Sequence, residues 1–406
     1  VPKRAIMEKM IDLQATGKDL EEFKAYAKMA SELSDCAVGY NAGNIALEYL
    51  ETFAGEFENH VKNKACEDAD YRRVPCETLC PAHVNIPAYI ALTAAGDYAG
   101  AINMIRRDNP FPTACALICE HPCEARCRRN MIDDAINIRG LKRYAVDHAG
   151  DVPQPACAPP TGKKVAIIGG GPSGLSCAYY LALMGHKVTV YEERAKLGGM
   201  LRYGIPSYRF PRHLLDAEID SILSLGIEAH TNTTVGTDVW VEELQKDYDC
   251  LYIAIGAHQD KKVGIPGEDC KNVMSAVEML RSIGDDVMPD FTGKQVVVIG
   301  GGNVAMDVTR SSIRLGAEKV TCVYRRWRYR PNKADLPEIR IPADIIVVAI
   351  GQGIEIQGFE QAGVPIKRGV FVAGLSGQVG DMDNLFAGGD CVTGPVVAAQ
   401  AAGRLG

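Results

Sequence analysis

The sequence lacks the long apolar runs and the excess of positive charge that mark two large classes of protein. No stretch approaches the roughly 18 to 20 consecutive apolar residues that a membrane-spanning helix needs, and the N-terminus does not follow a basic segment with an apolar one, as a secretory signal would. We therefore expect a cytoplasmic protein with no membrane span. Lysine and arginine total 44 against 51 aspartate and glutamate, a net charge of −7. This balance argues against nucleic acid as a partner.

Cysteine is plentiful, with 14 residues, but its spacing does not suggest disulfides. Half of the cysteines crowd into residues 66–127, and such clustering in a cytosolic chain indicates metal or iron–sulfur ligation. The Cys-x2-Cys pairs that are common in zinc sites are absent, which favours iron–sulfur clusters over zinc. The candidate ligands are Cys66, Cys76, Cys80, Cys115, Cys119, Cys123 and Cys127.

These thiols are more than one cluster needs and fewer than the eight that two all-cysteine clusters need. One cluster is therefore expected to take a non-cysteine ligand or a ligand from elsewhere. Asp68, Glu120 and Glu124 are oxygen donors in this region, although each is more typical of a solvated charge. The scattered cysteines that stand among apolar residues are expected in protein cores: Cys177, Cys250 and Cys322.

The pattern of apolar residues changes near Gly162. Before it, the patterns of residues 1–65 and of the cysteine-rich residues 66–150 are helical, and four prolines in residues 151–162 mark a linker. After it, short apolar runs alternate with helical stretches, which is the βαβ rhythm of a parallel sheet, and this rhythm restarts at Gly293. We predict an α/β protein in which N-terminal helical iron–sulfur domains precede two Rossmann-like dinucleotide-binding domains.

A glycine fingerprint follows the first predicted strand. Gly169, Gly171 and Gly174 have the spacing G-x-G-x-x-G between a strand and a helix. The first glycine permits a tight turn, the second lets a pyrophosphate approach the backbone, and the third lets helix and strand pack closely. Glu192 closes the next strand, about 20 residues on, where a carboxylate can bind a ribose hydroxyl. We predict a dinucleotide site here, over a plain glycine turn.

A second fingerprint, with Gly300, Gly302 and Ala305, differs at the acidic position. The strand that follows it ends in Arg325 and Arg326 in place of a carboxylate. Arginines can bind a 2′-phosphate in a bidentate manner, so they favour NADP over NAD; the alternative is a solvated basic loop. Two fingerprints imply two dinucleotides, one a flavin and one a nicotinamide, and hence hydride transfer between them.

A family resemblance rests on ordered motifs over residues 66–406: CPAHVNIPAYI, CALICEHPCEARCRR, INIRGLKRYA, VAIIGGGPSGLSCAYYLALMGHKVTVYE, GGMLRYGIPSYRFP, VVVIGGGNVAMDVTRSSIRLGA and LFAGGDCVTGP. They resemble the small (beta) subunit of NADPH-dependent glutamate synthase and its relative, the large subunit of the electron-bifurcating NADH-dependent ferredoxin:NADP oxidoreductase. The resemblance implies two 4Fe-4S clusters, one FAD and an NADPH site that faces the flavin. It also implies an FAD-binding domain at 163–290 and 341–406 and an NADPH-binding domain at 291–340.

The resemblance also implies which residues bind each dinucleotide. The FAD ligands would be Gly169, Gly171, Pro172, Ser173, Gly174, Glu192, Glu193, Gly199, Met200, Leu201, Arg202, Ile205, Gly256, Gly389 and Asp390. The NADPH ligands would be Gly300, Gly302, Asn303, Ala305, Arg325 and Arg326. No catalytic acid or base is expected, because hydride passes directly from nicotinamide to flavin. From the residues alone, Asp390 in LFAGGDC fits either a ribityl ligand or a plain turn.

The first 65 residues resemble something else, the tail of the flavoprotein subunit of respiratory NADH dehydrogenase. There a cysteine at the position of Cys36 is the fourth ligand of a 4Fe-4S cluster, so Cys36 is a candidate ligand of a third cluster; the alternative is a buried free cysteine. This fusion suggests a multisubunit electron-bifurcating transhydrogenase of the Sporomusa type.

Three departures from the family pattern affect these expectations. Asp68 and Tyr71 stand where the family has two further cysteines. The NADPH-binding domain is shorter than the family's, and we expect it to lack a segment around 331–340. The C-terminal sequence is irregular against the family's ending.

The function expected from all these features is that of an NADPH-dependent flavin and iron–sulfur oxidoreductase subunit. It would exchange hydride between NADPH and FAD and send single electrons through 4Fe-4S clusters to ferredoxin and NAD. Its partners would be other iron–sulfur and flavin subunits, ferredoxin, NADPH and NAD. One alternative is a glutamate synthase small subunit that passes NADPH electrons to a glutamate-forming large subunit. Another is an assembly module without turnover.

Overall fold

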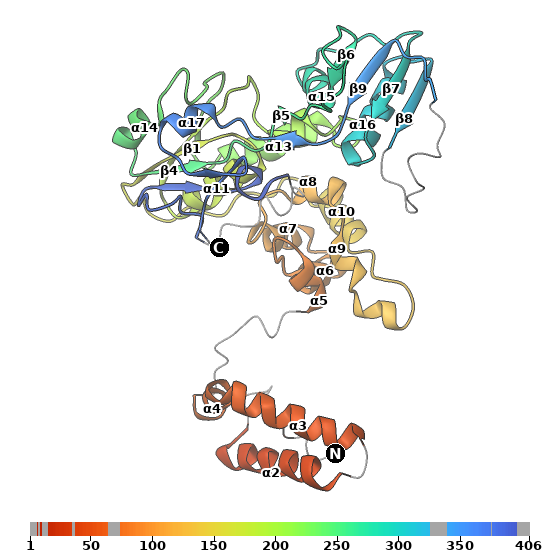
Figure 1. The fold of residues 1–406 in the computed structure, drawn as a ribbon. Coiled ribbons are helices and arrows are strands. Elements are labelled where there is room, and N and C mark those ends of the chain that lie inside the picture. Colours follow the sequence, from red (N-terminus) through yellow and green to blue (C-terminus); the bar gives the residue numbers. More distant parts are fainter. Residues whose placement is uncertain are drawn as a thin grey trace. The chain divides into compact units, whose positions relative to one another are not determined.

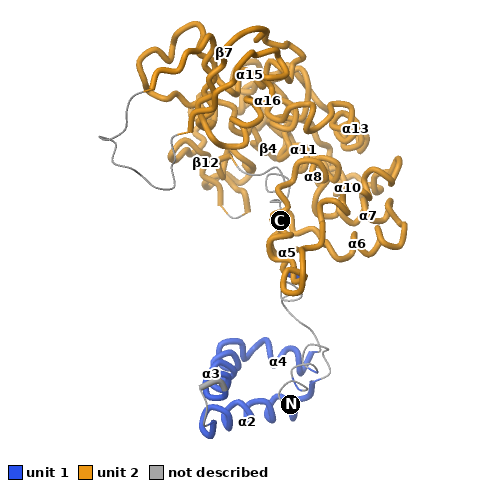
Figure 2. The backbone as a smooth tube through the Cα atoms, turned by 90° about the vertical axis from the view of Figure 1, so that its right-hand side faces the viewer, with its two compact units in different colours: residues 1–74 blue, residues 75–406 orange. Residues whose placement is uncertain are grey.

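The computed structural model describes Ile6, Lys9 and residues 15–34, 37–63, 74–324, 339–374 and 376–395. It divides into two compact units, residues 1–74 and 75–406 (Figure 2). Four predicted ligands, Cys36, Cys66, Arg325 and Arg326, lie outside the described residues, as do Asp68 and most of 331–340. None of the helices in the described ranges is long and apolar enough to cross a membrane.

The first unit is helical where it is described, as the sequence predicts. Its helices are α2 (Gly17–Leu33), α3 (Ala37–Thr52) and α4 (Ala54–Lys62). Thr16 and Asp19 form a capping box that begins α2: the Thr16 backbone N–H donates to the Asp19 carboxylate at 2.8 Å, and the Asp19 N–H donates to the Thr16 hydroxyl at 3.4 Å. Leu20, Phe23 and Leu50 form the small core between the helices.

The second unit begins with a compact helical region. Its helices are α5 (Pro75–Leu79), α6 (Ile86–Ala94), α7 (Tyr98–Arg106), α8 (Pro112–Ile118), α9 (Pro122–Ala125), the 3-10 helix η2 (Arg128–Met131) and α10 (Ile138–His148). Asn85, Asp97 and Asn137 begin α6, α7 and α10, and each accepts a backbone N–H with its side chain. The apolar core of this region contains Tyr89, Ile102 and Ile105.

A five-stranded parallel sheet follows, in the order β13-β4-β1-β2-β3. Its strands are β1 (Lys164–Ile168), β2 (Lys187–Tyr191), β3 (Glu228–His230), β4 (Cys250–Ile253) and β13 (Leu385–Ala387). Alternate residues of β1 face two separate cores, Ile167 on one side and Ile168 on the other, so both faces of the sheet are covered. The helices of this part are α11 (Pro172–Leu183), α12 (Met200–Tyr203), α13 (Arg212–Leu223), α14 (Val241–Asp247), α17 (Gln357–Gln361) and α18 (Asp390–Thr393).

A second parallel sheet has four strands in the order β6-β9-β7-β8. Its elements are β6 (Val273–Ser275), α15 (Ala276–Gly284), β7 (Gln295–Ile299), α16 (Asn303–Arg314), β8 (Lys319–Val323) and β9 (Ile345–Val348). Figure 1 shows α16 beside the strands of this sheet, and the two elements are in contact. After β9 the chain returns to the first sheet, and β13 takes its edge next to β4.

Two short antiparallel pairs complete the described strands. They are β5 (Gln259–Asp260) with β10 (Gln352–Gly353), and β11 (Ile366–Lys367) with β12 (Val370–Phe371). The predicted fold class, helical domains followed by two dinucleotide-binding sheets, is therefore confirmed. One smaller prediction is wrong: Cys322, on the edge strand β8, is exposed, whereas Cys177 is buried and Cys250 is half-buried.

Candidate functional site

A cavity of about 520 Å³ opens beside the carboxyl ends of β1, β2 and β4. The position suits a nucleotide, because ligands of doubly wound sheets bind beyond the carboxyl ends of their strands. Twelve residues predicted to bind FAD line it: Gly169, Gly171, Pro172, Ser173, Glu192, Glu193, Gly199, Met200, Leu201, Ile205, Gly256 and Asp390.

The turn between β1 and α11 can only be built from glycine at two places. Gly169 has φ +110°, and a Cβ there would lie 2.4 Å from the Ala254 carbonyl oxygen; a Cβ on Gly174 would lie 1.9 Å from the Gly169 oxygen. At Gly171 there is more room, because a Cβ there would meet only Gly199 Cα, at an ordinary contact distance of 3.7 Å. The exposed backbone at the start of α11 therefore fits the diphosphate of a dinucleotide.

Glu192 is held rigidly at the edge of the cavity. Its Oε2 accepts the Gly170 N–H at 2.7 Å and its Oε1 accepts the Arg194 N–H at 2.9 Å. The side chain is buried, and burial raises the pKa of its carboxyl above the usual range, although the two backbone donors oppose this shift. Each carboxylate oxygen keeps a free lone pair, so the group fits the ribose diol of a bound dinucleotide.

Three of the residues predicted to bind FAD do not line the cavity. Gly174 lies under the turn, where it permits the close approach described above. Gly389 begins α18 with φ +75°, and a Cβ there would lie 2.7 Å from the Ser173 Cβ. Arg202 is buried, where its Nε donates to the Leu197 carbonyl at 2.7 Å and its guanidinium pairs with Asp216. Arg202 therefore orders the loop before α12 in this structure.

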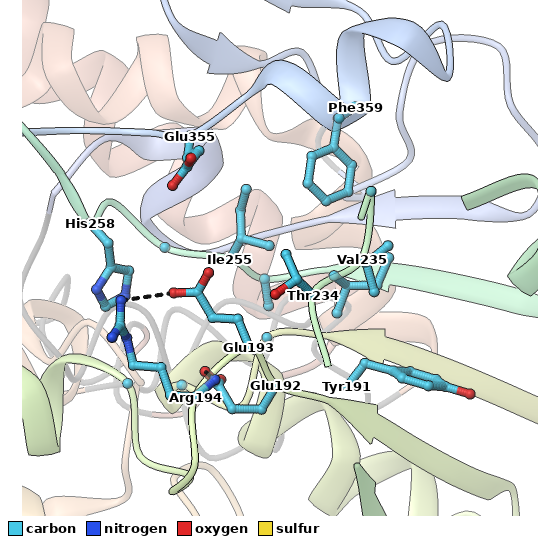
Figure 3. Close-up of a pocket in the computed structure, with 18 of the residues that line it drawn as sticks. Tyr191, Glu192, Glu193, Arg194, Thr234, Val235, Ile255, His258, Glu355 and Phe359 are labelled. Carbon is cyan, nitrogen blue, oxygen red and sulfur yellow. Dashed lines mark hydrogen bonds and ion pairs between the residues drawn. The ribbon is translucent and has the colours of Figure 1, made fainter. Parts of the chain in front are cut away.

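The cavity also has a wall that sequence reasoning missed. Figure 3 shows Glu355 and Phe359 across the pocket from Glu192 and Glu193. Thr234 and Val235, which follow β3, and Trp240 also line it. These residues belong to no glycine motif and reach the site only through the packing of loops, so no local pattern could identify them.

A small charged group stands at one end of the cavity. Arg194 Nη2 lies 3.1 Å from Glu193 Oε1 (Figure 3). His258 is next to this pair, and burial lowers the pKa of its imidazole to about 4, with Arg194 and Arg281 contributing. His258 is therefore neutral at physiological pH.

The second fingerprint forms the same kind of turn between β7 and α16. Gly300 has φ +150°, and a Cβ there would lie 2.2 Å from the Ala349 carbonyl oxygen. Gly302 faces open space, and Ala305 is fully buried in the core behind the turn. Asn303, the first residue of α16, donates from Nδ2 to Glu120 Oε1 at 2.6 Å. Of the residues predicted to bind NADPH, the structure brings these four together.

Polar contacts attach α16 to the FAD-type sheet region. Arg209 Nη1 lies 2.5 Å from Asp307 Oδ2, and the Tyr208 hydroxyl donates to the Asp307 carbonyl at 3.2 Å. The Arg314 guanidinium stands 3.9 Å from the centroid of the Tyr208 ring. The two nucleotide turns are thus held within one compact unit.

The described cysteines of the candidate cluster region lie in and between short helices. Cys76 lies in α5, Cys115 in α8 and Cys123 in α9, while Cys119 and Cys127 occupy the loops that follow α8 and α9. The first helix α5 packs against α9. Burial raises the pKa of Tyr89, and the neighbouring thiols of Cys123, Cys80, Cys76 and Cys119 raise it further. Three of the predicted ligands, Cys76, Cys80 and Cys123, pack in the same apolar core as Tyr89.

The chemistry of these thiols fits an iron–sulfur cluster. Burial raises the pKa of Cys115 to about 11 and that of Cys123 to about 12, so a cationic centre is needed to hold them as thiolates. Lys142 of α10 is buried and lowers both pKa values. Among the described residues no group of three His, Cys, Asp or Glu is arranged around a single ion.

Of the three acidic residues considered as ligands, Asp68 lies outside the described residues, and the other two are engaged elsewhere. Glu124 accepts the Arg139 N–H at 2.9 Å and pairs with His121 at 2.9 Å. Glu120 binds Asn303, as described above. Neither carboxylate is therefore directed to the cysteines by these contacts.

A buried carboxylate joins the cluster region to the first sheet region. Glu218 of α13 accepts the N–H groups of Thr113 and Ala114, at 2.6 and 3.0 Å, and so caps α8. Burial raises the pKa of Glu218 to about 7. Phe111 and Ala114 belong to the same apolar core as Leu201, which lines the cavity. Helix α8 therefore connects the candidate flavin cavity to Cys115.

Three family models match the chain. Residues 163–340 and 333–406 match the pyridine nucleotide-disulphide oxidoreductase model. Residues 61–152 match domain II of dihydropyrimidine dehydrogenase, a 4Fe-4S cluster domain, and residues 3–60 match the iron–sulfur binding region of NADH-ubiquinone oxidoreductase-F.

Several curated proteins are similar to the chain. The NADP(+)-dependent formate dehydrogenase subunit beta of Moorella thermoacetica is 36% identical over 81% of this chain and 58% of that protein. The NADPH-Fe(3+) oxidoreductase subunit beta of Geobacter sulfurreducens is 37% identical over 82% of this chain and 51% of that protein. The glutamate synthase [NADPH] small chain of Halomonas elongata is 30% identical over 81% of this chain and 85% of that protein.

The chain spans little more than half the length of the first two of these relatives. At the level of the matching families, the predicted cofactor classes are confirmed: FAD, NADP(H) and 4Fe-4S clusters. The predicted enzyme class, a pyridine-nucleotide-dependent flavin and iron–sulfur oxidoreductase, is confirmed at the same level. The chain belongs to the pyridine nucleotide-disulphide oxidoreductase family.

Proposed function

We propose that this chain is the NADPH-oxidising subunit of a multisubunit redox complex, in which electrons pass from NADPH to FAD and then singly to 4Fe-4S clusters. The observation that carries the proposal is the shared core of α8 and the flavin cavity, which contains both Leu201 and Ala114, next to Cys115. Bound FAD would supply the conversion of a two-electron hydride into single electrons.

The residues of the chain have distinct parts in this proposal. The Gly169–Gly174 turn and Glu192 bind the FAD diphosphate and ribose, and the Gly300–Ala305 turn binds the diphosphate of NADPH. The pair of Arg209 and Asp307 sets the position of α16 against the flavin-binding region. Arg325 and Arg326 bind the 2′-phosphate. The domain division proposed with these roles is 1–65, 66–150, the linker 151–162, an FAD-binding part and an NADPH-binding part. We assign β6, α15 and β9 to the NADPH-binding part, because β6 and β9 belong to the sheet of β7 and β8, so this part is larger than the 291–340 expected from the sequence.

We further propose that the complex bifurcates electrons, sending one towards NAD and the other to ferredoxin. Support comes from the match of residues 3–60 to an iron–sulfur region of an NADH-oxidising enzyme, in a chain that also carries two dinucleotide turns. In this proposal Cys36 is a ligand of a further cluster, and a cytoplasmic location follows from the thiolate chemistry.

A second candidate function is the supply of NADPH electrons to a glutamate-forming subunit. It is favoured by the similarity to the Halomonas elongata glutamate synthase small chain, 85% of which is covered. This function needs the same flavin and cluster residues and omits NAD and ferredoxin.

The two candidates are separated by anaerobic ferredoxin reduction with the purified native complex. Ferredoxin is added with NADPH alone and with NADPH plus NAD. Ferredoxin reduction that occurs only when NAD is present is the result expected for bifurcation. Reduction that is independent of NAD contradicts bifurcation, and glutamate formation from glutamine and 2-oxoglutarate without ferredoxin reduction supports the second candidate.

A further inference from the structure

The loop between α8 and α9 has contacts on two sides. On the cluster side, Arg139 Nη1 donates to the Cys119 carbonyl at 2.8 Å, and the His121 backbone N–H donates to Cys119 Sγ at 3.3 Å. On the other side, Glu120 reaches Asn303 at the first turn of α16. Glu120, which follows the candidate cluster ligand Cys119, thus contacts the second nucleotide turn at Asn303, 183 residues away in the sequence.

The Glu120 carboxylate binds the side chain of Asn303, the first residue of α16, and a nucleotide anion is expected at the same helix start. In a dinucleotide-binding turn the diphosphate lies at the start of the helix, because the free N–H groups and the dipole there favour negative charge. The backbone in front of this turn is accessible, since a Cβ on Gly302 would meet no atom within 4 Å. A carboxylate on Asn303 and a diphosphate at the same helix start would repel one another.

We propose that Glu120 gates the second nucleotide site: its carboxylate occupies the start of α16, and a dinucleotide phosphate must displace it. This inference rests on the proposed function, because it takes the Gly300–Ala305 turn as the NADPH site. Displacement frees the Glu120 side chain, which directly follows Cys119 in the sequence. Nucleotide binding and the environment of the cluster are therefore coupled, and the coupling acts equally in both directions.

Among the described residues, the other carboxylates on the two elements that meet at this contact have partners of their own. His121 and Glu124 pair with each other. The Arg139 guanidinium donates to the Cys119 carbonyl, and the Arg139 backbone N–H donates to Glu124. On the helix side, the Asp307 carboxylate is paired with Arg209. Removal of the Glu120 charge should therefore relieve the competition without a second carboxylate moving into its place.

The test measures the binding of 2′-phospho-ADP-ribose, which has the phosphates of NADPH but cannot exchange hydride. Equilibrium dialysis is done on the oxidised holoprotein within its native complex, with wild type, Glu120→Gln and Glu120→Ala. The control is Glu318→Gln, which removes an exposed carboxylate just beyond the other end of α16. We expect both Glu120 variants to bind the probe about fivefold more tightly, a typical size for coupled sites, and the control to match wild type.

Unchanged or weaker binding by the Glu120 variants, with wild-type iron and FAD content, would overturn the gate. Failure of both the wild type and the Glu120 variants to bind the probe would instead refute the proposed NADPH site itself, so the two failures are distinguishable. A second measurement needs no variant. The EPR spectrum of the dithionite-reduced wild type should change when 2′-phospho-ADP-ribose is added, and an identical spectrum would contradict the coupling.

Discussion

Replacement of Glu192 by glutamine gives the sharpest prediction for the flavin cavity. The two oxygens of the Glu192 carboxylate accept separate backbone N–H groups, from Gly170 and Arg194. Glutamine has almost the same shape but offers one oxygen and one NH₂ group. One of the two backbone donors must therefore face another donor, and the ribose diol loses a charged acceptor.

The cost can be worked from these contacts. A hydrogen bond to a charged group contributes about 1.5 to 3 kcal/mol, and each 1.4 kcal/mol corresponds to about a tenfold change in affinity. Glu192→Gln should therefore weaken FAD binding by about 10- to 100-fold. Glu193→Gln is the matched control: this neighbour also lines the cavity, but its side chain is 44% exposed and pairs with Arg194. Its loss should change FAD binding by less than about threefold.

The assay is fluorescence titration of flavin-free protein with FAD, together with the FAD content of each variant as purified. Equal affinities of Glu192→Gln and wild type would refute the role of Glu192. A larger loss in Glu193→Gln than in Glu192→Gln would show that the ribose lies at the other carboxylate.

Three further predictions concern the connections between regions. Burial raises the pKa of Glu218 from 4.5 to about 7, so the folded state binds this proton more tightly than the unfolded state. Up to about 3 kcal/mol of stability is therefore lost as the pH rises from about 4.5 to about 7. Between pH 5 and pH 8 the thermal stability of Glu218→Gln should decline less than that of the wild type, and an equal decline would contradict the role of Glu218. Lys142→Gln removes a buried positive charge near Cys115 and Cys123. It should lower the reduction potential of a cluster by about 60 mV, which corresponds to a tenfold change in a one-electron equilibrium. EPR-monitored redox titration checks this, and Lys142→Arg should keep a potential near that of the wild type. Arg209→Ala leaves the buried Asp307 carboxylate without its partner, which should lower the free energy of unfolding by about 3 kcal/mol. In equilibrium dialysis the variant should bind NADP+ more weakly while its FAD content is retained. Unchanged NADP+ affinity would show that the pair does not position α16.

The parts of the fold that the sequence predicts well are those that depend on local patterns. The turn at Gly169 needs a positive φ, and a Cβ added to this residue would lie 2.4 Å from a carbonyl oxygen. Because only glycine fits there, the glycine pattern in the sequence predicts the turn directly. The same holds for Gly300. The alternating apolar residues of β1 face two cores, which the continuous run of apolar residues indicates.

The parts that it predicts poorly depend on long-range packing. Glu355 and Phe359 reach the flavin cavity because the chain returns to the first sheet after β9, and nothing local marks them as site residues. Arg202 stands in a motif of the family, yet its guanidinium is buried against Asp216 and Leu197. Glu120 looks like a solvated charge in the sequence, and only the contact with Asn303 gives it a role. Whether the predicted cofactor ligands bind as proposed stays a prediction.

Anaerobic addition of NADPH to the intact complex tests most directly whether electrons pass from NADPH through the flavin cavity to the cysteines. Flavin absorbance and cluster EPR are followed in the same sample. The proposed path predicts that flavin absorbance is bleached and that a reduced 4Fe-4S signal appears, with the signal lost in Cys123→Ser. Bleaching of the flavin without any cluster signal in the wild type would contradict electron transfer along α8.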